Sequence, residues 1–316
     1  GRAALSTTLF ALLSQGDHMV GTASVYGPSR VLVERDFSRF GVSSTFVDTS
    51  DLDAVRAALR PRTRLIMVET PANPTIVLSD IRALAEIAHD HGALLVVDNT
   101  FASPILQRPL SFGADVVYHS MTKFINGHTD VVAGIIVARK EDVLERLRKV
   151  HVNLGGTMDP HQAWLVLRGI KTLGLRMERA QANARALAYY LQRHADVKWV
   201  NYPGLVDHPQ HPLMKQQMRG PGAIVTFGVR GGLEAGRRLI NSVDLATLAV
   251  SLGGVETLIE HPASMTHAGV PEKERLEAGI ANDLVRISVG CEDYEDLERD
   301  LEQALEQASR GATAGV

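Results

Sequence analysis

The chain has 316 residues, of which 45% are hydrophobic and 22% charged, and its formal net charge at pH 7 is -3. This length and apolar content predict a globular protein of two domains, and the lack of any Lys/Arg run or stripe argues against nucleic acid or an anionic membrane as partner. Cys291 is the only cysteine, which excludes an internal disulfide or a thiolate zinc site and favours a reducing compartment such as the cytoplasm.

The first half of the chain alternates apolar runs with helical patterns. Residues 4–16 are apolar but lack a basic leader and a cleavage site, so they predict a buried helix, and no run approaches the roughly 20 residues of a membrane span. Six runs predict strands that are apolar on both faces: residues 17–24, 42–48, 63–69, 93–98, 114–120 and 131–139. Residues 79–92 predict an amphipathic helix that is capped by Ser79 and ends at Gly92. Such repeated units indicate a mainly parallel α/β sheet.

The pattern changes after residue 158. Residues 159–194 form one long helical pattern, with Gly169 and Gly174 as its weak points. Strand-like segments at 197–203, 222–229 and 284–290 then alternate with helical segments at 233–243 and 295–308. We therefore expect an α/β domain over residues 1–158, followed over residues 159–316 by a long linking helix and a smaller α+β domain.

Polar residues follow two of the predicted strands. Asp98 ends the fourth run and Ser120 ends the fifth, and Thr122 and Lys123 follow closely. Because ligands bind beyond the carboxyl ends of strands in an open parallel sheet, these side chains are expected to converge. Taken singly, each is an ordinary loop residue. Together they suit pyridoxal 5'-phosphate (PLP), whose aldehyde takes a lysine, whose pyridinium pairs with an aspartate and whose phosphate accepts hydroxyl hydrogen bonds.

Five sequence blocks carry a family resemblance. They are ETPANPT (69–75), VVDNTFASP (96–104), HSMTKFINGHTDVVAG (119–134), SLGGVETLIEHPASMTH (251–267) and VRISVG (285–290). In this order they closely resemble the Cys/Met-metabolism family of PLP-dependent enzymes, which includes cystathionine γ-synthase, cystathionine γ-lyase, O-succinylhomoserine sulfhydrylase and methionine γ-lyase. The resemblance implies the type I, aspartate aminotransferase-like fold of PLP-dependent transferases.

The resemblance also implies roles for the residues beyond the strands. It makes Lys123 the lysine that bonds to the cofactor and later acts as general base, and Asp98 the partner of the pyridinium nitrogen. Ser120 and Thr122 correspond to phosphate ligands.

Other matched positions complete the implied site. Gly1 and Arg2 fall where backbone N–H groups at a helix N-terminus bind the phosphate, although the family usually has Met or a small residue in place of Arg2. Tyr26 matches the tyrosine that stacks on the cofactor ring and helps to move protons, and Asn73 matches the residue near the ring oxygen.

Two more matched positions concern the substrate. Arg286 matches the arginine that grips the substrate carboxylate with its planar fork, and Ser251 matches the serine that contacts the lysine and the substrate.

Methionine γ-lyase is the member of the family that the sequence resembles most. GHTDVVAG and the pattern over residues 160–177 support this comparison, and Val250 offers an apolar wall where lyases acting on cystathionine tend to carry Glu. Pro28 departs from methionine γ-lyases, which usually carry a cysteine there, and His151 and Val152 stand near their usual Lys-Asp pair. A cystathionine γ-lyase, a cystathionine γ-synthase or a sulfhydrylase stays an alternative.

The resemblance has further implications for partners. The family normally has some tens of residues before the position of Gly1, with a Tyr-x-Arg pair that reaches the neighbouring subunit's phosphate site, and we expect that segment to be absent from this chain. Shared sites imply a symmetric homo-oligomer, a tetramer built as a dimer of dimers.

The histidines lack metal-ligand spacing, so no metal is expected. A catalytically inactive binding protein on the same fold is the non-enzyme alternative, against which Lys123, Asp98, Tyr26 and Arg286 argue jointly.

Overall fold

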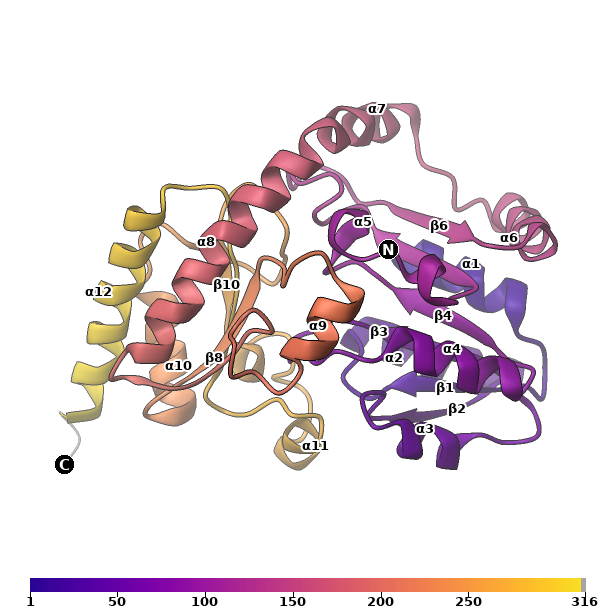
Figure 1. Ribbon diagram of the computed structural model, residues 1–316, viewed down its shortest axis with the longest axis horizontal. Coiled ribbons are helices and arrows are strands. Elements are labelled where there is room, and N and C mark those ends of the chain that lie inside the picture. Colours follow the sequence, from indigo (N-terminus) through magenta and orange to yellow (C-terminus); the bar gives the residue numbers. More distant parts are fainter. Residues whose placement is uncertain (314–316) are drawn as a thin grey trace. The chain divides into compact units, whose positions relative to one another are not determined.

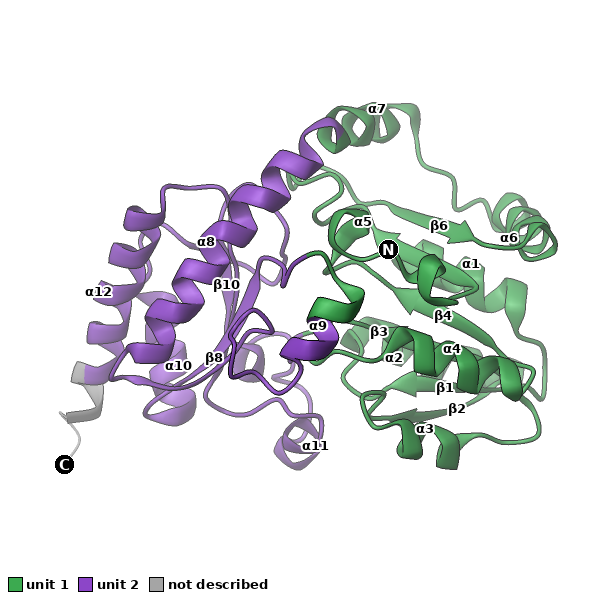
Figure 2. Ribbon diagram, in the orientation of Figure 1, with its two compact units in different colours: residues 1–73, 77–170, 215–219 green, residues 74–76, 171–214, 220–316 purple. Residues whose placement is uncertain are grey.

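The chain forms two compact units in a computed structural model that describes residues 1–313 (Figure 1, Figure 2). Unit 1 contains Gly1–Asn73, Val77–Ile170 and Lys215–Arg219. Unit 2 contains Pro74–Ile76, Lys171–Met214 and the residues from Gly220 onward. Helix α9 (His211–Gln217) has residues in both units.

Unit 1 is built on a six-stranded sheet with the order β2-β1-β3-β4-β5-β6 (Figure 1). Its strands are β1 (His18–Thr22), β2 (Ser43–Val47), β3 (Thr63–Glu69), β4 (Leu94–Asp98), β5 (Val116–Ser120) and β6 (Gly134–Ala138). Neighbouring strands pair in parallel except β5 and β6, which pair antiparallel. Each strand lies within a range predicted from the sequence, so the mainly parallel sheet is confirmed.

Helices cover both faces of this sheet. The helices of unit 1 are α1 (Arg2–Leu12), α2 (Gly27–Val31), α3 (Leu52–Ala58), α4 (Ile81–Asp90), α5 (Ser103–Leu106), α6 (Glu141–Leu154) and α7 (Pro160–Gly169), of which α1, α3, α4 and α6 pack on the sheet. Alternate residues of the central strands belong to two apolar clusters, one shared with α1 and α6 and the other with α3 and α4. Both faces of the strands are therefore buried, which explains their nearly continuous apolar sequences.

The start of α4 differs from the sequence prediction by one residue. Asp80, not Ser79, is the N-cap, and its carboxylate accepts a hydrogen bond of 3.0 Å from the Ala83 N–H. The Ser79 hydroxyl instead bonds to Thr49 Oγ1 at 2.8 Å, and the Ser79 N–H donates to Thr70 Oγ1 at 3.0 Å. Tertiary partners therefore bind the serine, and the aspartate caps the helix.

The division between the units also lies later than the sequence suggests, at Ile170 and Lys171 instead of 158 and 159. Helix α7 packs on unit 1, where Gln162 Oε1 accepts the Val132 N–H at 3.1 Å. A Cβ at Gly169 would lie only 2.3 Å from the Asn126 carbonyl oxygen, so this glycine allows a very close approach of the helix to the loop. The long helical pattern breaks here, at a 3-10 turn (Ile170–Thr172), as the position of Gly169 predicted.

Unit 2 contains a five-stranded sheet with the order β7-β8-β11-β10-β9. Its remaining elements are α8 (Leu173–Arg193), β7 (Val197–Asn201), β8 (Ile224–Val229), α10 (Gly232–Asn241), β9 (Thr247–Leu248), β10 (Leu258–Glu260), α11 (Glu272–Glu277), β11 (Leu284–Ser288) and α12 (Tyr294–Thr313). Its strands pair antiparallel except β9 and β10. Apolar residues of α8, α10 and α12 pack with the sheet in one core, which gives the expected α+β texture. Over residues 1–313, no helix combines the length and apolarity needed to cross a membrane.

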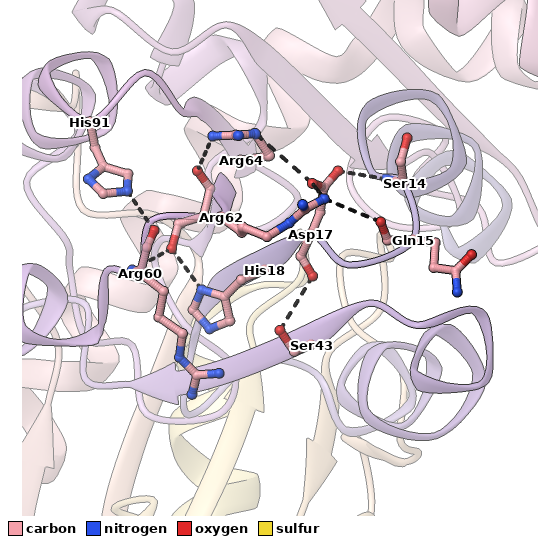
Figure 3. Close-up of polar contacts among 10 residues, drawn as sticks. Ser14, Gln15, Asp17, His18, Ser43, Arg60, Arg62, Arg64 and His91 are labelled. Atoms are coloured by element: carbon pink, nitrogen blue, oxygen red, sulfur yellow. Dashed lines mark hydrogen bonds and ion pairs between the residues drawn. The ribbon is translucent and has the colours of Figure 1, made fainter.

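Polar residues form hydrogen bonds and an ion pair with one another at the amino-terminal edge of the unit 1 sheet (Figure 3). The buried His18 ring bonds to Thr63 Oγ1 at 2.7 Å and to Thr45 Oγ1 at 2.9 Å. Asp17 accepts the Ser14 N–H at 2.8 Å and lies 3.4 Å from an Arg62 nitrogen. Burial lowers the pKa of His18 to about 4, so the ring is neutral at pH 7. These contacts give the polar residues at this edge of the sheet a structural role.

Candidate active site

The carboxyl edge of the unit 1 sheet brings together polar residues from three adjacent strands. Asp98 on β4 is the register partner of Glu69 on β3 and of Tyr118 on β5. Ser120 ends β5. The convergence of Asp98 and Ser120 that the strand ends predict is therefore present, and two side chains that the sequence did not single out, Glu69 and Tyr118, stand beside them.

Thr100 links Asp98 to Ser120. Its N–H and its hydroxyl both donate to Asp98 Oδ1, at 2.9 and 2.5 Å. Its hydroxyl oxygen in turn accepts the Ser120 N–H at 2.9 Å. Thr100 was missed from the sequence because a threonine two residues after a strand is also an ordinary turn residue. In the folded chain it orients the carboxylate and fixes the end of the next strand.

The Asp98 carboxylate lies deep within the protein, although part of the residue remains accessible to solvent. Burial raises its pKa, and the hydrogen bonds from Thr100 and the nearby Tyr118 hydroxyl act in the opposite direction. Burial disfavours the charged form of an acid, and an adjacent cation restores it. A carboxylate in this position is therefore suited to a cationic ligand group such as a protonated ring nitrogen.

Gly1, Ser120 and Thr122 lie around one stretch of backbone. The Gly1 nitrogen donates to the Ala133 carbonyl oxygen at 2.6 Å, and the Ala133 N–H donates to Thr122 Oγ1 at 3.0 Å. A Cβ on Gly1 would lie 2.9 Å from both Cβ and Oγ of Ser120. Only glycine fits so close to the serine, and the result is a small cradle of hydroxyl groups at the start of α1. Arg2, the first residue of that helix, is exposed.

Lys123 is held in a tight turn directly after β5. Its N–H donates to the Ser120 carbonyl oxygen at 3.2 Å, and its own carbonyl oxygen accepts the Gly127 N–H at 2.8 Å. The residue is half-buried. Backbone hydrogen bonds thus fix the position of Lys123, which follows Ser120 by three residues in the sequence.

A buried carboxylate connects the loops of Tyr26 and Asn73. Glu69 is 4% exposed, and its two oxygens accept the Tyr26 N–H at 3.0 Å and the Asn73 N–H at 2.7 Å. The Tyr26 side chain is 42% exposed at the start of α2. Glu69 therefore fixes both loops at the sheet edge, which the sequence did not reveal because its partners lie on separate loops.

Ser251 and Arg286 form a group of their own within unit 2. Arg286 is 1% exposed on β11, where its Nη1 lies 2.9 Å from Glu260 Oε1 on the neighbouring strand β10. Its Nη2 donates to the Ser251 carbonyl oxygen at 2.7 Å. Read from its residue type alone, an arginine on a strand would be a surface ion pair. The structure instead shows a buried guanidinium with a fixed orientation.

Two of the positions that depart from the family pattern are exposed, His151 is half-buried, and one other histidine has an evident structural role. Pro28 is exposed on α2, and Val152 is 73% exposed on α6. His261 is buried and bonds to Ser264 Oγ at 2.9 Å and to the Asn282 carbonyl oxygen at 2.8 Å. Among the residues that the structure describes, no group of three or more His, Cys, Asp or Glu could hold a metal ion.

The chain is similar to enzymes of sulfur amino-acid metabolism along almost its whole length. It is 49% identical over 304 residues to an L-methionine gamma-lyase of Treponema denticola, covering 95% of this chain and 76% of the relative. It is 46% identical over 300 residues to a cystathionine gamma-lyase of Bacillus subtilis, covering 95% of this chain and 79% of the relative.

A solved structure agrees with these relatives. The crystal structure of cystathionine gamma-lyase from Lactobacillus plantarum complexed with L-serine superposes with a TM-score of 0.94 at 40% identity, covering 97% of this chain and 80% of that chain. The α/β, type I fold expected from the sequence is thereby confirmed. The model of the Cys/Met metabolism PLP-dependent enzyme family matches residues 1–306, and the chain belongs to this family, whose cofactor is pyridoxal 5'-phosphate.

Proposed function

We propose that the chain is a carbon-sulfur lyase of the methionine γ-lyase type, which converts L-methionine and water into methanethiol, 2-oxobutanoate and ammonia. The observation that carries the reaction class is the joint presence, at one sheet edge, of Lys123, the deep carboxylate Asp98 and the hydroxyl cradle at Gly1. The choice of methionine draws on relatives of that name from Treponema denticola and Fusobacterium nucleatum, at 46–49% identity.

The residues of unit 1 fit PLP. Asp98, whose charged form is disfavoured by burial, would pair with the ring nitrogen, and Ser120 and Thr122 would bind the phosphate together with the backbone N–H groups of Gly1 and Arg2. The close contact at Gly1 leaves the cradle free of a side chain at that position, as a phosphate requires. Tyr26 would stack on the ring and Asn73 would contact the ring oxygen, on loops that Glu69 fixes.

PLP, when bound, supplies the electron withdrawal that makes the α-proton of the amino acid acidic. Lys123 would hold the cofactor through Nζ. Once the substrate amine takes its place, the freed Lys123 amine would accept the α-proton, return it to the bound substrate and cofactor, and only then accept a β-proton. Tyr26 gives a proton to the leaving thiolate at Cγ. Asp98 keeps the proton on the ring nitrogen throughout. Water releases 2-oxobutanoate and ammonia from the remaining four-carbon unit.

Residues of unit 2 would select the substrate. We assign the substrate carboxylate to Arg286, whose guanidinium is fixed by Glu260 and by the Ser251 carbonyl oxygen, and we assign to Ser251 a contact with substrate. The side chain of Val250 is 56% exposed and would present an apolar surface to the S-methyl group. An apolar contact of this kind gives little binding to the distal amino group of a longer substrate.

Cystathionine is the second candidate substrate, because sequence identity to the relatives does not distinguish between methionine and cystathionine. Relatives named cystathionine gamma-lyase or cystathionine beta-lyase in Bacillus subtilis are 45–46% identical to this chain, close to the values for the methionine enzymes. The similar solved structures also include metB from Corynebacterium glutamicum, at 43% identity and a TM-score of 0.93. The proposal further includes a homo-oligomer, as a dimer of dimers, and a cytoplasmic location favoured by the single cysteine.

The test combines absorbance with product analysis. We expect the purified protein to show a visible cofactor band that Lys123→Ala abolishes, and to release methanethiol and 2-oxobutanoate from L-methionine. Values of kcat/KM for L-methionine and L-cystathionine, measured on the same preparation, decide the substrate. A visible band with an inert methionine and an active O-acylhomoserine plus thiol would instead identify a synthase or sulfhydrylase, and a protein without the band would refute the proposal.

A further inference from the structure

A buried tyrosine, Tyr118, lies beside Asp98 in the sheet. The two are register partners on the neighbouring parallel strands β5 and β4, and Glu69 on β3 is the partner of Asp98 on its other side. Residues paired in this way on parallel strands point to the same face of the sheet. The phenol and the two carboxylates therefore form one row at the carboxyl edge.

The hydroxyl group of Tyr118 is enclosed by protein. The residue is 2% exposed, and its oxygen has no hydrogen bond of ordinary geometry within the described residues, although the hydroxyl lies near enough to the Asp98 carboxylate to interact with it. An unsatisfied hydroxyl in a protein interior is costly, and such groups are uncommon enough to call for an explanation. Burial, followed by the carboxylates of Asp98 and Glu69, raises the pKa of Tyr118 well above its usual value. The phenol is therefore protonated at neutral pH and can donate a hydrogen bond.

Of the two neighbouring carboxylates, Asp98 is the one whose pKa a further hydrogen-bond donor would lower more. Both oxygens of Glu69 already accept backbone N–H groups, from Tyr26 and Asn73. At Asp98 both hydrogen bonds from Thr100 go to Oδ1. Burial raises the pKa of Asp98, and the nearby Tyr118 hydroxyl acts to lower it.

We propose that Tyr118 is a positioning residue, which donates a hydrogen bond to Asp98 in the holoenzyme and so keeps that carboxylate ionised beside the ring nitrogen of PLP. This inference rests on the role proposed above for Asp98. An ionised Asp98 leaves the proton on the ring nitrogen, whereas a more basic Asp98 draws that proton to itself. Tyr118 would thus set the electron-withdrawing strength of the site without touching the substrate.

The test measures the ring nitrogen directly. Holoenzyme is prepared with PLP labelled with nitrogen-15 in the ring, for the parent and for Tyr118→Phe, which removes only the hydroxyl. We expect the nitrogen-15 resonance of the variant to move toward that of an unprotonated pyridine. We also expect kcat to fall about tenfold while KM changes less than about threefold, as for a lost hydrogen bond to a charged group.

Tyr202→Phe is the matched control, because Tyr202 is a fully buried tyrosine whose hydroxyl donates to the Gly222 carbonyl oxygen at 2.8 Å within unit 2. It should lower the unfolding temperature without moving the nitrogen-15 resonance. In an Asp98→Asn background, Tyr118→Phe should have no further effect on the resonance, as coupled residues require.

Two results would overturn the inference. A bound cofactor whose resonance is the same in the parent and in Tyr118→Phe refutes the role of Tyr118 and leaves the proposed function standing. A parent protein that binds no PLP refutes the proposed function, and the role of Tyr118 with it.

Discussion

Gly169→Ala tests how α7 supports the loop that carries Lys123. A Cβ at position 169 would lie 2.3 Å from the Asn126 carbonyl oxygen and 3.1 Å from both the carbonyl carbon and Oδ1 of Asn126. Contacts of a Cβ below 3.0 Å essentially never occur, so the two backbones must separate by at least the difference between 3.0 and 2.3 Å. Asn126 is bonded through its N–H to the Met121 carbonyl oxygen at 3.1 Å, so this movement reaches the turn that holds Lys123.

The expected magnitude follows from two opposing effects. Overpacking of a well-packed site costs about 1–3 kcal/mol in the free energy of unfolding, and alanine in place of a helical glycine returns about 0.5–1 kcal/mol. We therefore expect Gly169→Ala to be destabilised by up to about 2.5 kcal/mol, a fall of up to about 10 °C in the unfolding temperature for a unit of this size. We also expect a weaker visible cofactor band at a fixed PLP concentration, because the Lys123 turn has moved.

Gly174→Ala is the control for this experiment. A Cβ at Gly174 would have no atom of the described chain within 4 Å, and the residue is exposed in the first turn of α8. This variant should gain about 0.4–1 kcal/mol in stability and keep the full band. Urea unfolding followed by circular dichroism gives the stability of each variant. A Gly169→Ala protein as stable as Gly174→Ala, with an unchanged band, would show that the close contact at Asn126 does not support the site.

Three further perturbations test the site and its surroundings. Thr100→Val removes a hydroxyl that donates to Asp98 and accepts from Ser120, so PLP affinity measured by equilibrium dialysis should fall about tenfold or more, whereas an unchanged affinity would contradict this link. Burial lowers the pKa of His119 to about 4, below its unfolded value near 6.5, so the unfolded state takes up the proton first and stability falls as pH drops from 6.5 toward 4, by about 2 kcal/mol at pH 5. Urea unfolding of the parent and of His119→Asn at pH 7.5 and pH 5 measures this loss of stability. If the free energy of unfolding changed equally with pH in both proteins, the prediction would be contradicted. Val250→Glu should raise the ratio of kcat/KM for cystathionine over methionine at least about tenfold, and an unaltered ratio would exclude Val250 from substrate selection.

Much of the architecture follows from the sequence alone, because it depends on local patterns. The unbroken apolar runs at 63–69 and 93–98 are compatible only with strands buried on both faces, and helices do cover both faces. The weak point at Gly169 marks the true end of α7. The strand ends at Asp98 and Ser120 predicted one shared edge, since parallel strands place their carboxyl ends together.

Other features were decided by tertiary contacts between residues far apart in the sequence. Ser79 looks like a helix cap, but Thr49 and Thr70 bind it and leave that role to Asp80. The sequence pattern predicts that α7 starts the second domain, yet its close packing on the Asn126 loop assigns it to unit 1.

The site shows the same distinction. Asp98 and Lys123 were proposed from the sequence because together with Ser120 and Thr122 they form a combination that suits PLP. Glu69, Thr100 and Tyr118 were not, since an acid, a hydroxyl and a phenol at these places carry no local signal of their own. Their importance comes from sheet register, which places Glu69 and Tyr118 on either side of Asp98. It also comes from burial, because in a protein interior neighbouring hydrogen-bond donors have a larger effect on the pKa of the Asp98 carboxylate. The sequence by itself thus determined the family and the cofactor and singled out Lys123 as a candidate, and only the packed sheet decided which side chains lie beside Asp98.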